Sequence, residues 1–173
     1  MVYRFRVILD AEEDVFRDIE ILKDSSLEDF HNSITQAFGF EGNEMASFYI
    51  SNEEWEQGEE IALFDMSESG TSSRLMHSTE IQEVVSKEQT KLIYIYDYLS
   101  MWTFMVELAD IGDIELGREY PNLMFAHGVL PESAPQKSFE AEIDLDDDEF
   151  NDSLFDDLNI DDLDSLGFNE QWN

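Results

Sequence analysis

The strongest constraint on the fold is an amphipathic helix pattern that follows two strand patterns. Residues 27–38 place apolar side chains at helical spacing, so that one face of the predicted helix is apolar. Ser25 or Ser26 can cap the start of this helix, and Gly39 is a natural stop. Because such a helix must bury its apolar face, it requires a sheet or another helix to pack on.

Strand patterns lie on both sides of this helix. Residues 2–9 alternate between apolar and polar side chains, as in a half-buried strand, and residues 15–22 are typical of the returning strand of a hairpin. Further strand patterns lie at residues 45–51, 61–64, 91–96 and 102–108. The order predicts an α+β fold, with one main helix packed on a face of a mixed or antiparallel sheet in a β-grasp-like order.

The sequence beyond the last hairpin changes character. From Gly112 onward it contains Gly and Pro without a clear period, which predicts irregular chain. We therefore expect an α+β domain over residues 1–129, a linker over 130–137 and an acidic, apolar tail over 138–173. Short helices are possible in the tail.

The charge of the chain restricts its partners. Forty-two acids face nine bases, which gives a formal net charge of -33. Such a chain repels nucleic-acid phosphates and anionic membrane surfaces, whereas it attracts a basic protein surface. We expect no direct nucleic-acid binding and no membrane binding. There is no Cys, no apolar run of membrane-spanning length and no signal-peptide pattern, so we expect a cytoplasmic protein.

Candidates for chemistry are sparse. Weak acid/base candidates are His31 on the helix and Asp97 in the hairpin turn; the simpler interpretations are a structural His and a turn-forming Asp. The acidic tail lacks the Gly and the terminal Glu of an EF-hand loop, and three scattered His residues do not define a zinc site. We expect no metal site and no cofactor.

The tail carries large apolar residues between its acids. Such a segment would be a marginal helix alone and is typical of peptides that fold on a partner. A basic or grooved protein surface would complement its acids. The predicted partner-binding residues are Phe150, Leu154, Phe155, Leu158, Leu163 and Leu166.

The chain resembles a known family in several motifs. The matching residues are Phe16, Arg17, Leu27, Phe30, His31, Ala37, Phe38, Gly39, Phe40, Phe48, Tyr94, Tyr96, Asp97, Tyr98 and Trp102. They are similar to the Ri-plasmid open-reading-frame-three-like family, some of whose members are described as insertion-element passenger proteins. The family's Gly-Asp in the late turn is replaced by Leu99–Ser100. The resemblance implies an α+β fold and no established enzymatic activity.

The leading hypothesis is a non-enzymatic protein-interaction module whose tail docks on a partner protein. The alternatives are an enzyme of unrecognised class, with a pocket between the main helix and the aromatic hairpin, and an acidic nucleic-acid mimic. The tail could also be disordered without a binding role, or fold back on the domain. Folding back would require a basic patch built from Arg4, Arg6, Arg17, Lys87 and Lys91.

Overall fold

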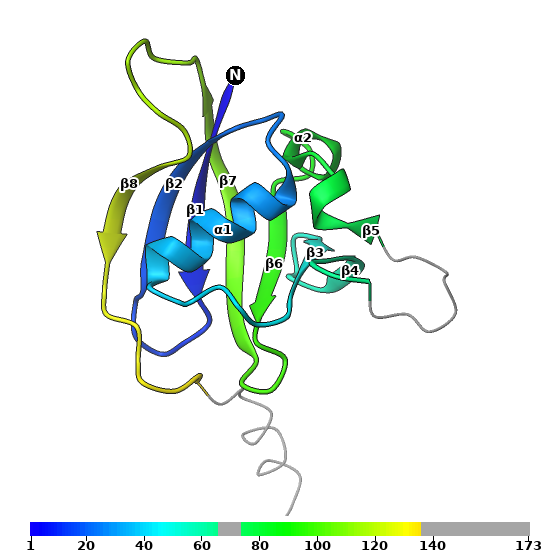
Figure 1. The fold of residues 1–173 in the computed structure, drawn as a ribbon, viewed down its shortest axis with the longest axis vertical. Coiled ribbons are helices and arrows are strands. Elements are labelled where there is room, and N and C mark those ends of the chain that lie inside the picture. Colours follow the sequence, from blue (N-terminus) through cyan, green and yellow to red (C-terminus); the bar gives the residue numbers. More distant parts are fainter. Residues whose placement is uncertain (66–73, 136–173) are drawn as a thin grey trace, which may run out of the picture. The chain divides into compact units, whose positions relative to one another are not determined.

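A mixed sheet carries the main helix on one face (Figure 1). The computed structural model describes residues 1–65 and 74–135. The helical elements are α1 (Leu27–Phe38), the 3-10 helix η1 (Met76–Ser78) and α2 (Ile81–Val84). The strands are β1 (Val2–Leu9), β2 (Phe16–Leu22), β3 (Ala46–Ser51), β4 (Gln57–Ala62), β5 (Arg74–Leu75), β6 (Lys91–Tyr96), β7 (Trp102–Gly112) and β8 (Asn122–His127).

The strands lie in the order β5-β4-β3-β6-β7-β1-β2-β8. Neighbours are antiparallel except for the short parallel pair β4 and β5. The predicted α+β class, with one main helix on a face of the sheet, is confirmed. Within the described residues, no helix has the length and apolar character needed to cross a membrane.

One segment was predicted wrongly. Asn122–His127 was expected to be irregular chain, but it forms β8 and pairs with β2. Its sequence, NLMFAH, lacks the alternation of a half-buried strand, because β8 lies at an edge of the sheet and five of its six residues are exposed. Pairing with β2, rather than its own pattern, makes this segment a strand.

Helix α1 begins and ends as its sequence predicts. The Ser26 hydroxyl accepts a hydrogen bond from the Asp29 N–H at 3.1 Å, and the Asp29 carboxylate accepts one from the Ser26 N–H at 3.2 Å. Gly39 follows the helix with a φ of 83°, the left-handed conformation that glycine adopts without a steric penalty. These caps satisfy backbone groups that the helix leaves unpaired.

The core lies between α1 and the sheet. Phe30, on the inward face of the helix, packs against Phe5 of β1 and Phe48 of β3, with ring centroids 4.6 and 5.5 Å apart. All three side chains are at most 1% exposed. This contact joins the helix to both halves of the sheet.

The opposite face of the sheet carries charged side chains in cross-strand pairs. Arg4 of β1 bonds Glu20 of β2 at 2.9 Å and Asp110 of β7 at 2.8 Å. Opposite charges on neighbouring strands stabilise their register. In this way the sheet pairs several of the chain's few bases with its acids.

The chain beyond β8 returns to the domain before the described residues end. Leu130 and Ala134 are partly buried and pack against the core. The compact unit extends from Met1 to Pro135. The predicted acidic tail lies outside the described residues.

Substitution Gly39→Ala should lower the free energy of unfolding by about 1–2 kcal/mol, because an L side chain is strained at this positive φ. A Cβ at this position would meet no atom within 4 Å, so the penalty is conformational rather than a clash. Urea unfolding measures the change. Gln36→Ala, an exposed substitution in the last turn of α1, is the control, and an equal effect of the two variants would contradict the assignment.

Candidate functional site

His31 lies in the interior, between α1 and the sheet. Its side chain is 1% exposed, and its Nδ1 shares a hydrogen bond of 2.6 Å with the hydroxyl of Tyr94 on β6. The Tyr94 side chain is fully buried. The sequence candidate for acid/base chemistry is therefore one half of a buried polar pair.

Both members of this pair are uncharged at neutral pH. Burial lowers the pKa of His31 to about 4, and burial raises the pKa of Tyr94 well above its ordinary value. The hydrogen bond consequently joins two neutral groups and satisfies each of them in the interior. This arrangement suits a structural role, because a histidine with so low a pKa is a weak base and stays unprotonated at neutral pH.

The segment after α1 is held by the aromatic hairpin of β6 and β7. The Phe40 ring stacks on Tyr96 at 4.5 Å and meets the edge of Trp102 at 5.3 Å. The Gly42 N–H donates to the Tyr96 hydroxyl at 3.1 Å. The aromatic residues of the sequence motifs therefore lie together where the helix meets the hairpin.

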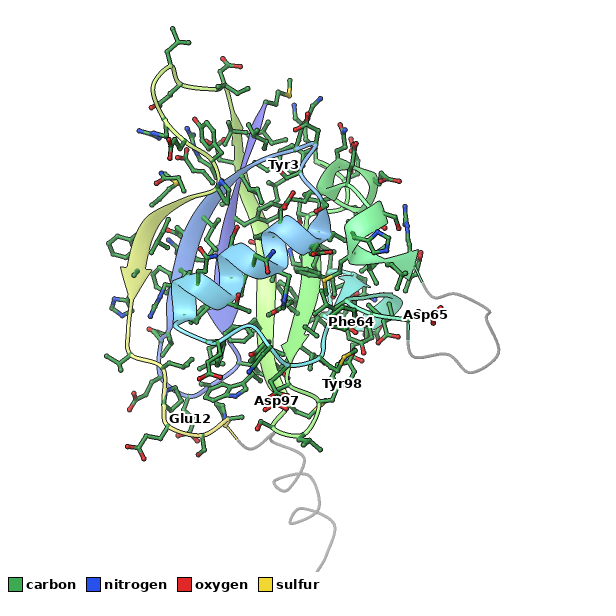
Figure 2. All side chains as sticks on the ribbon, in the orientation of Figure 1. Tyr3, Glu12, Phe64, Asp65, Asp97 and Tyr98 are labelled. Atoms are coloured by element: carbon green, nitrogen blue, oxygen red, sulfur yellow. The ribbon has the colours of Figure 1, made fainter. Side chains whose placement is uncertain are left out.

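Asp97 closes the turn between β6 and β7 (Figure 2). Its φ is 61°, and its carboxylate accepts a hydrogen bond from the Leu99 N–H at 3.1 Å. Its carbonyl accepts another from the Met101 N–H at 2.6 Å. These bonds are typical of a turn-forming Asp. Each acid/base candidate thus has its own structural hydrogen bonds, and none of the bonds in the described residues joins Asp97 to His31.

The model of the Plasmid pRiA4b ORF-3-like protein family matches residues 1–134. The chain belongs to this family. The match confirms the resemblance that the motif residues indicated, and most of those residues lie where α1 and the segment after it meet the sheet.

The same fold is found among solved structures. One example is the crystal structure of a protein of unknown function, MM3350, from Methanosarcina mazei Go1. The two chains are 18% identical with a TM-score of 0.68, and the alignment covers 92% of this chain and 90% of the other. A search of curated proteins found no match.

A second polar cluster in this pRiA4b ORF-3-like protein was not anticipated from the sequence. The hydroxyls of Ser47 and Tyr49, both on β3, donate to the Glu60 carboxylate on β4 at 2.9 Å each, and Tyr98 bonds the Ser47 hydroxyl. Burial and the bond to Glu60 raise the pKa of Tyr49 to about 12. Ser47 is fully buried, so its hydroxyl is inaccessible to a substrate. The alternation of polar and apolar residues along β3 could have indicated that Ser47 and Tyr49 share one face of the sheet.

Arg17, another family motif residue, is 8% exposed and joins three elements. Its guanidinium donates to the carbonyls of Phe16, Ala37 and His127 at 2.8, 3.1 and 2.9 Å, and it lies over the Phe38 ring. Burial lowers its pKa. Through these hydrogen bonds, Arg17 of β2 links the end of α1 and the edge strand β8 to β2.

Four of the five bases that could have formed a basic patch are engaged within the domain, and Lys87 alone is exposed without an ion pair in the described residues. Arg17 is buried, and Arg4 has two carboxylate partners. Arg6 pairs with Asp18 at 2.8 Å. Lys91 of β6 pairs with two carboxylates of its own, at 2.7 and 3.1 Å. The described domain therefore presents little uncompensated positive charge at these positions.

A hollow in the domain lies away from the acid/base candidates. It has a volume of about 520 Å³ and lies where β1 begins and β7 ends. Its lining includes Met1, Lys87, Thr90, Asp110 and Ile111. Neither His31 nor Asp97 lines it. In residues 1–65 and 74–135, no group of three or more His, Asp or Glu side chains is placed to hold a metal ion.

The predicted partner-binding residues of the tail lie outside the described residues. They are Phe150, Leu154, Phe155, Leu158, Leu163 and Leu166.

Substitution Tyr94→Phe should lower the free energy of unfolding by about 1–3 kcal/mol, because it leaves the buried His31 Nδ1 without a partner. The double variant His31→Leu with Tyr94→Phe removes both polar groups and should recover part of the loss. Denaturant unfolding of both variants measures this. A single variant as stable as the wild type would contradict the role of the bond.

The His31–Tyr94 pair also predicts a pH dependence. The folded pKa of His31 is about 4 and its ordinary value is 6.5, so the unfolded chain binds the extra proton between these values. The resulting stability is complete above pH 6.5 and is lost as the pH falls through about 4. The loss is on the order of 3 kcal/mol. The double variant should lack this component, and identical pH profiles of wild type and double variant would refute it.

Proposed function

We propose that this protein is a non-enzymatic protein-interaction module, whose segment 138–173 docks on a partner with a basic surface. The observation that carries the proposal is the composition of that segment: fourteen acids, no Lys or Arg, and large apolar residues between the acids. Acidic, apolar segments of this kind fold onto the grooves of other proteins.

The charges of the domain support a basic partner. An acidic segment needs positive charge to dock on, and five of the eight bases in the described residues, namely Arg4, Arg6, Arg74, Lys91 and Arg118, are already in ion pairs. A partner rich in Lys and Arg supplies the charge that the domain does not. Attraction between opposite charges also speeds association and makes it sensitive to salt.

The apolar residues supply the larger part of the expected affinity. Phe150, Leu154, Phe155 and Leu158 recur with the spacing of one helical stripe. Burial of four large apolar side chains contributes roughly 6–10 kcal/mol, from which several kcal/mol are lost in ordering the segment. The remainder is sufficient for a reversible complex.

The geometry of the domain is consistent with a non-enzymatic role. His31 is engaged with Tyr94 in the interior, and Asp97 is engaged with the backbone of its turn. Their hydrogen bonds account for their positions in the family motif without a catalytic step.

Substituting both Phe155→Asp and Leu158→Asp should weaken partner capture from a cell lysate by about 100-fold or more, because two buried side chains are lost from the stripe. Removing residues 138–173 should abolish capture. Quantitative pulldown with the full chain measures both effects, and capture should weaken as salt is raised.

The matched control is the pair Asn151→Asp and Asn159→Asp, which adds the same charge and leaves the four stripe residues unchanged. This control should retain capture. If the Phe155 and Leu158 variant captures the same proteins with the same strength as the control, the segment is not the docking element.

A further inference from the structure

Exposed apolar side chains are concentrated in one segment of the sequence. Ten large apolar side chains are exposed in the described residues, and six of them lie between residues 114 and 129. They are Ile114, Leu116, Leu123, Met124, Phe125 and Val129. Leu123, Met124 and Phe125, all in β8, are 48%, 46% and 52% exposed. Three successive exposed apolar side chains on one strand indicate a contact site.

Strand β8, which carries three of these side chains, lies at an edge of the sheet (Figure 1). In the described residues, β8 pairs with β2 along one side and with no strand along the other. An unpaired edge presents backbone N–H and C=O groups that can bond another strand. Proteins commonly protect such edges with charged residues, but β8 contains no Asp, Glu, Lys or Arg.

The edge strand is firmly held before any partner arrives. Arg17 donates to the His127 carbonyl, and the Asn122 amide donates to the buried Glu20 carboxylate at 3.0 Å. The Phe125 ring packs 5.9 Å from the Phe16 ring. A fixed edge loses little conformational entropy when a second strand binds.

The charge pattern of the sequence indicates what binds the β8 edge. Residues 120–131 form a run of twelve without Asp, Glu, Lys or Arg in a chain of net charge -33. Two copies of this chain repel each other wherever their acids come close. Residues 120–131 carry no acids, so two copies can meet there without this repulsion. A basic partner, by contrast, gains no charge complementarity from this run. The partner that fits this edge best is another uncharged strand, and the β8 strand of a second copy is such a strand.

We propose that the β8 edge binds the β8 edge of a second copy, antiparallel and related by a two-fold axis. An antiparallel strand pair of this kind is self-complementary, so one surface serves both copies. The sheets of the two copies would then be continuous. The contact is independent of segment 138–173, so the proposal goes beyond the docking function proposed above.

The β8 contact and the docking function should respond to salt in opposite directions. Because both copies are acidic, screening of their repulsion should strengthen the self-association, whereas it should weaken capture of a basic partner. The two interactions can therefore be distinguished by the sign of their salt dependence.

The test is sedimentation velocity of the full chain, whose monomer mass is 20.1 kDa, over a range of protein and salt concentrations. Wild type should form a species of twice the monomer mass as either concentration rises. Met124→Asp should weaken this association at least tenfold, because each copy then brings a carboxylate to the shared edge. Met124 is suitable because a bulge leaves it without an opposite residue in β2.

The matched control is Leu99→Asp, which adds the same charge at a side chain 95% exposed in the β6–β7 turn. It should associate like the wild type. A wild type that stays monomeric under all conditions overturns the proposal, as does equal association of the two variants.

Hydrogen exchange of the wild type gives a readout that does not depend on the folding of a variant. Amides of residues 122–127 should exchange more slowly as protein concentration rises. Exchange that is independent of concentration overturns the proposal. So does protection, in a monomer, of the β8 amides that do not bond β2, which would mean that another segment covers the edge.

Discussion

The packing of α1 on the aromatic centre of the sheet is the contact on which the rest of this structure depends. Phe30 lies against Phe5 and Phe48, and the neighbouring His31 bonds Tyr94 across the same interface. The residues shared with the pRiA4b ORF-3-like family occupy this contact or its borders. Membership of the family is therefore expressed mainly as a fold, and the polar motif residues Arg17, His31 and Tyr94 serve the interior.

Charge then determines what the surface can do. The few bases are largely used within the domain: Arg4 pairs with carboxylates across strands, and Arg17 is buried against backbone carbonyls. Forty-two acids face nine bases in the chain, so most of the acids have no base to pair with. A protein of this kind associates either through apolar, uncharged surface, as proposed for β8, or with basic partners, as proposed for segment 138–173.

Much of the fold was predictable because it depends on local patterns. Alternation identified β1, and the helical period with its caps at Ser26 and Gly39 identified α1. The strand β8 was missed because its pairing with β2 depends on residues roughly a hundred positions apart. The bond between His31 and Tyr94 spans 63 positions and was not accessible from spacing. Sequence reasoning named His31 as a weak candidate and a structural His as the simpler interpretation, and the burial of its side chain supports the structural role.

The account's central claim is that segment 138–173 captures a partner by burying its apolar stripe. The most direct measurement is hydrogen exchange of residues 150–166 in the full chain, alone and in a complex isolated with a captured partner. The account predicts weak protection alone and strong protection in the complex, because burial and helix formation occur together on the partner. Equal exchange in the two states, in a complex that is shown to be intact, would contradict it.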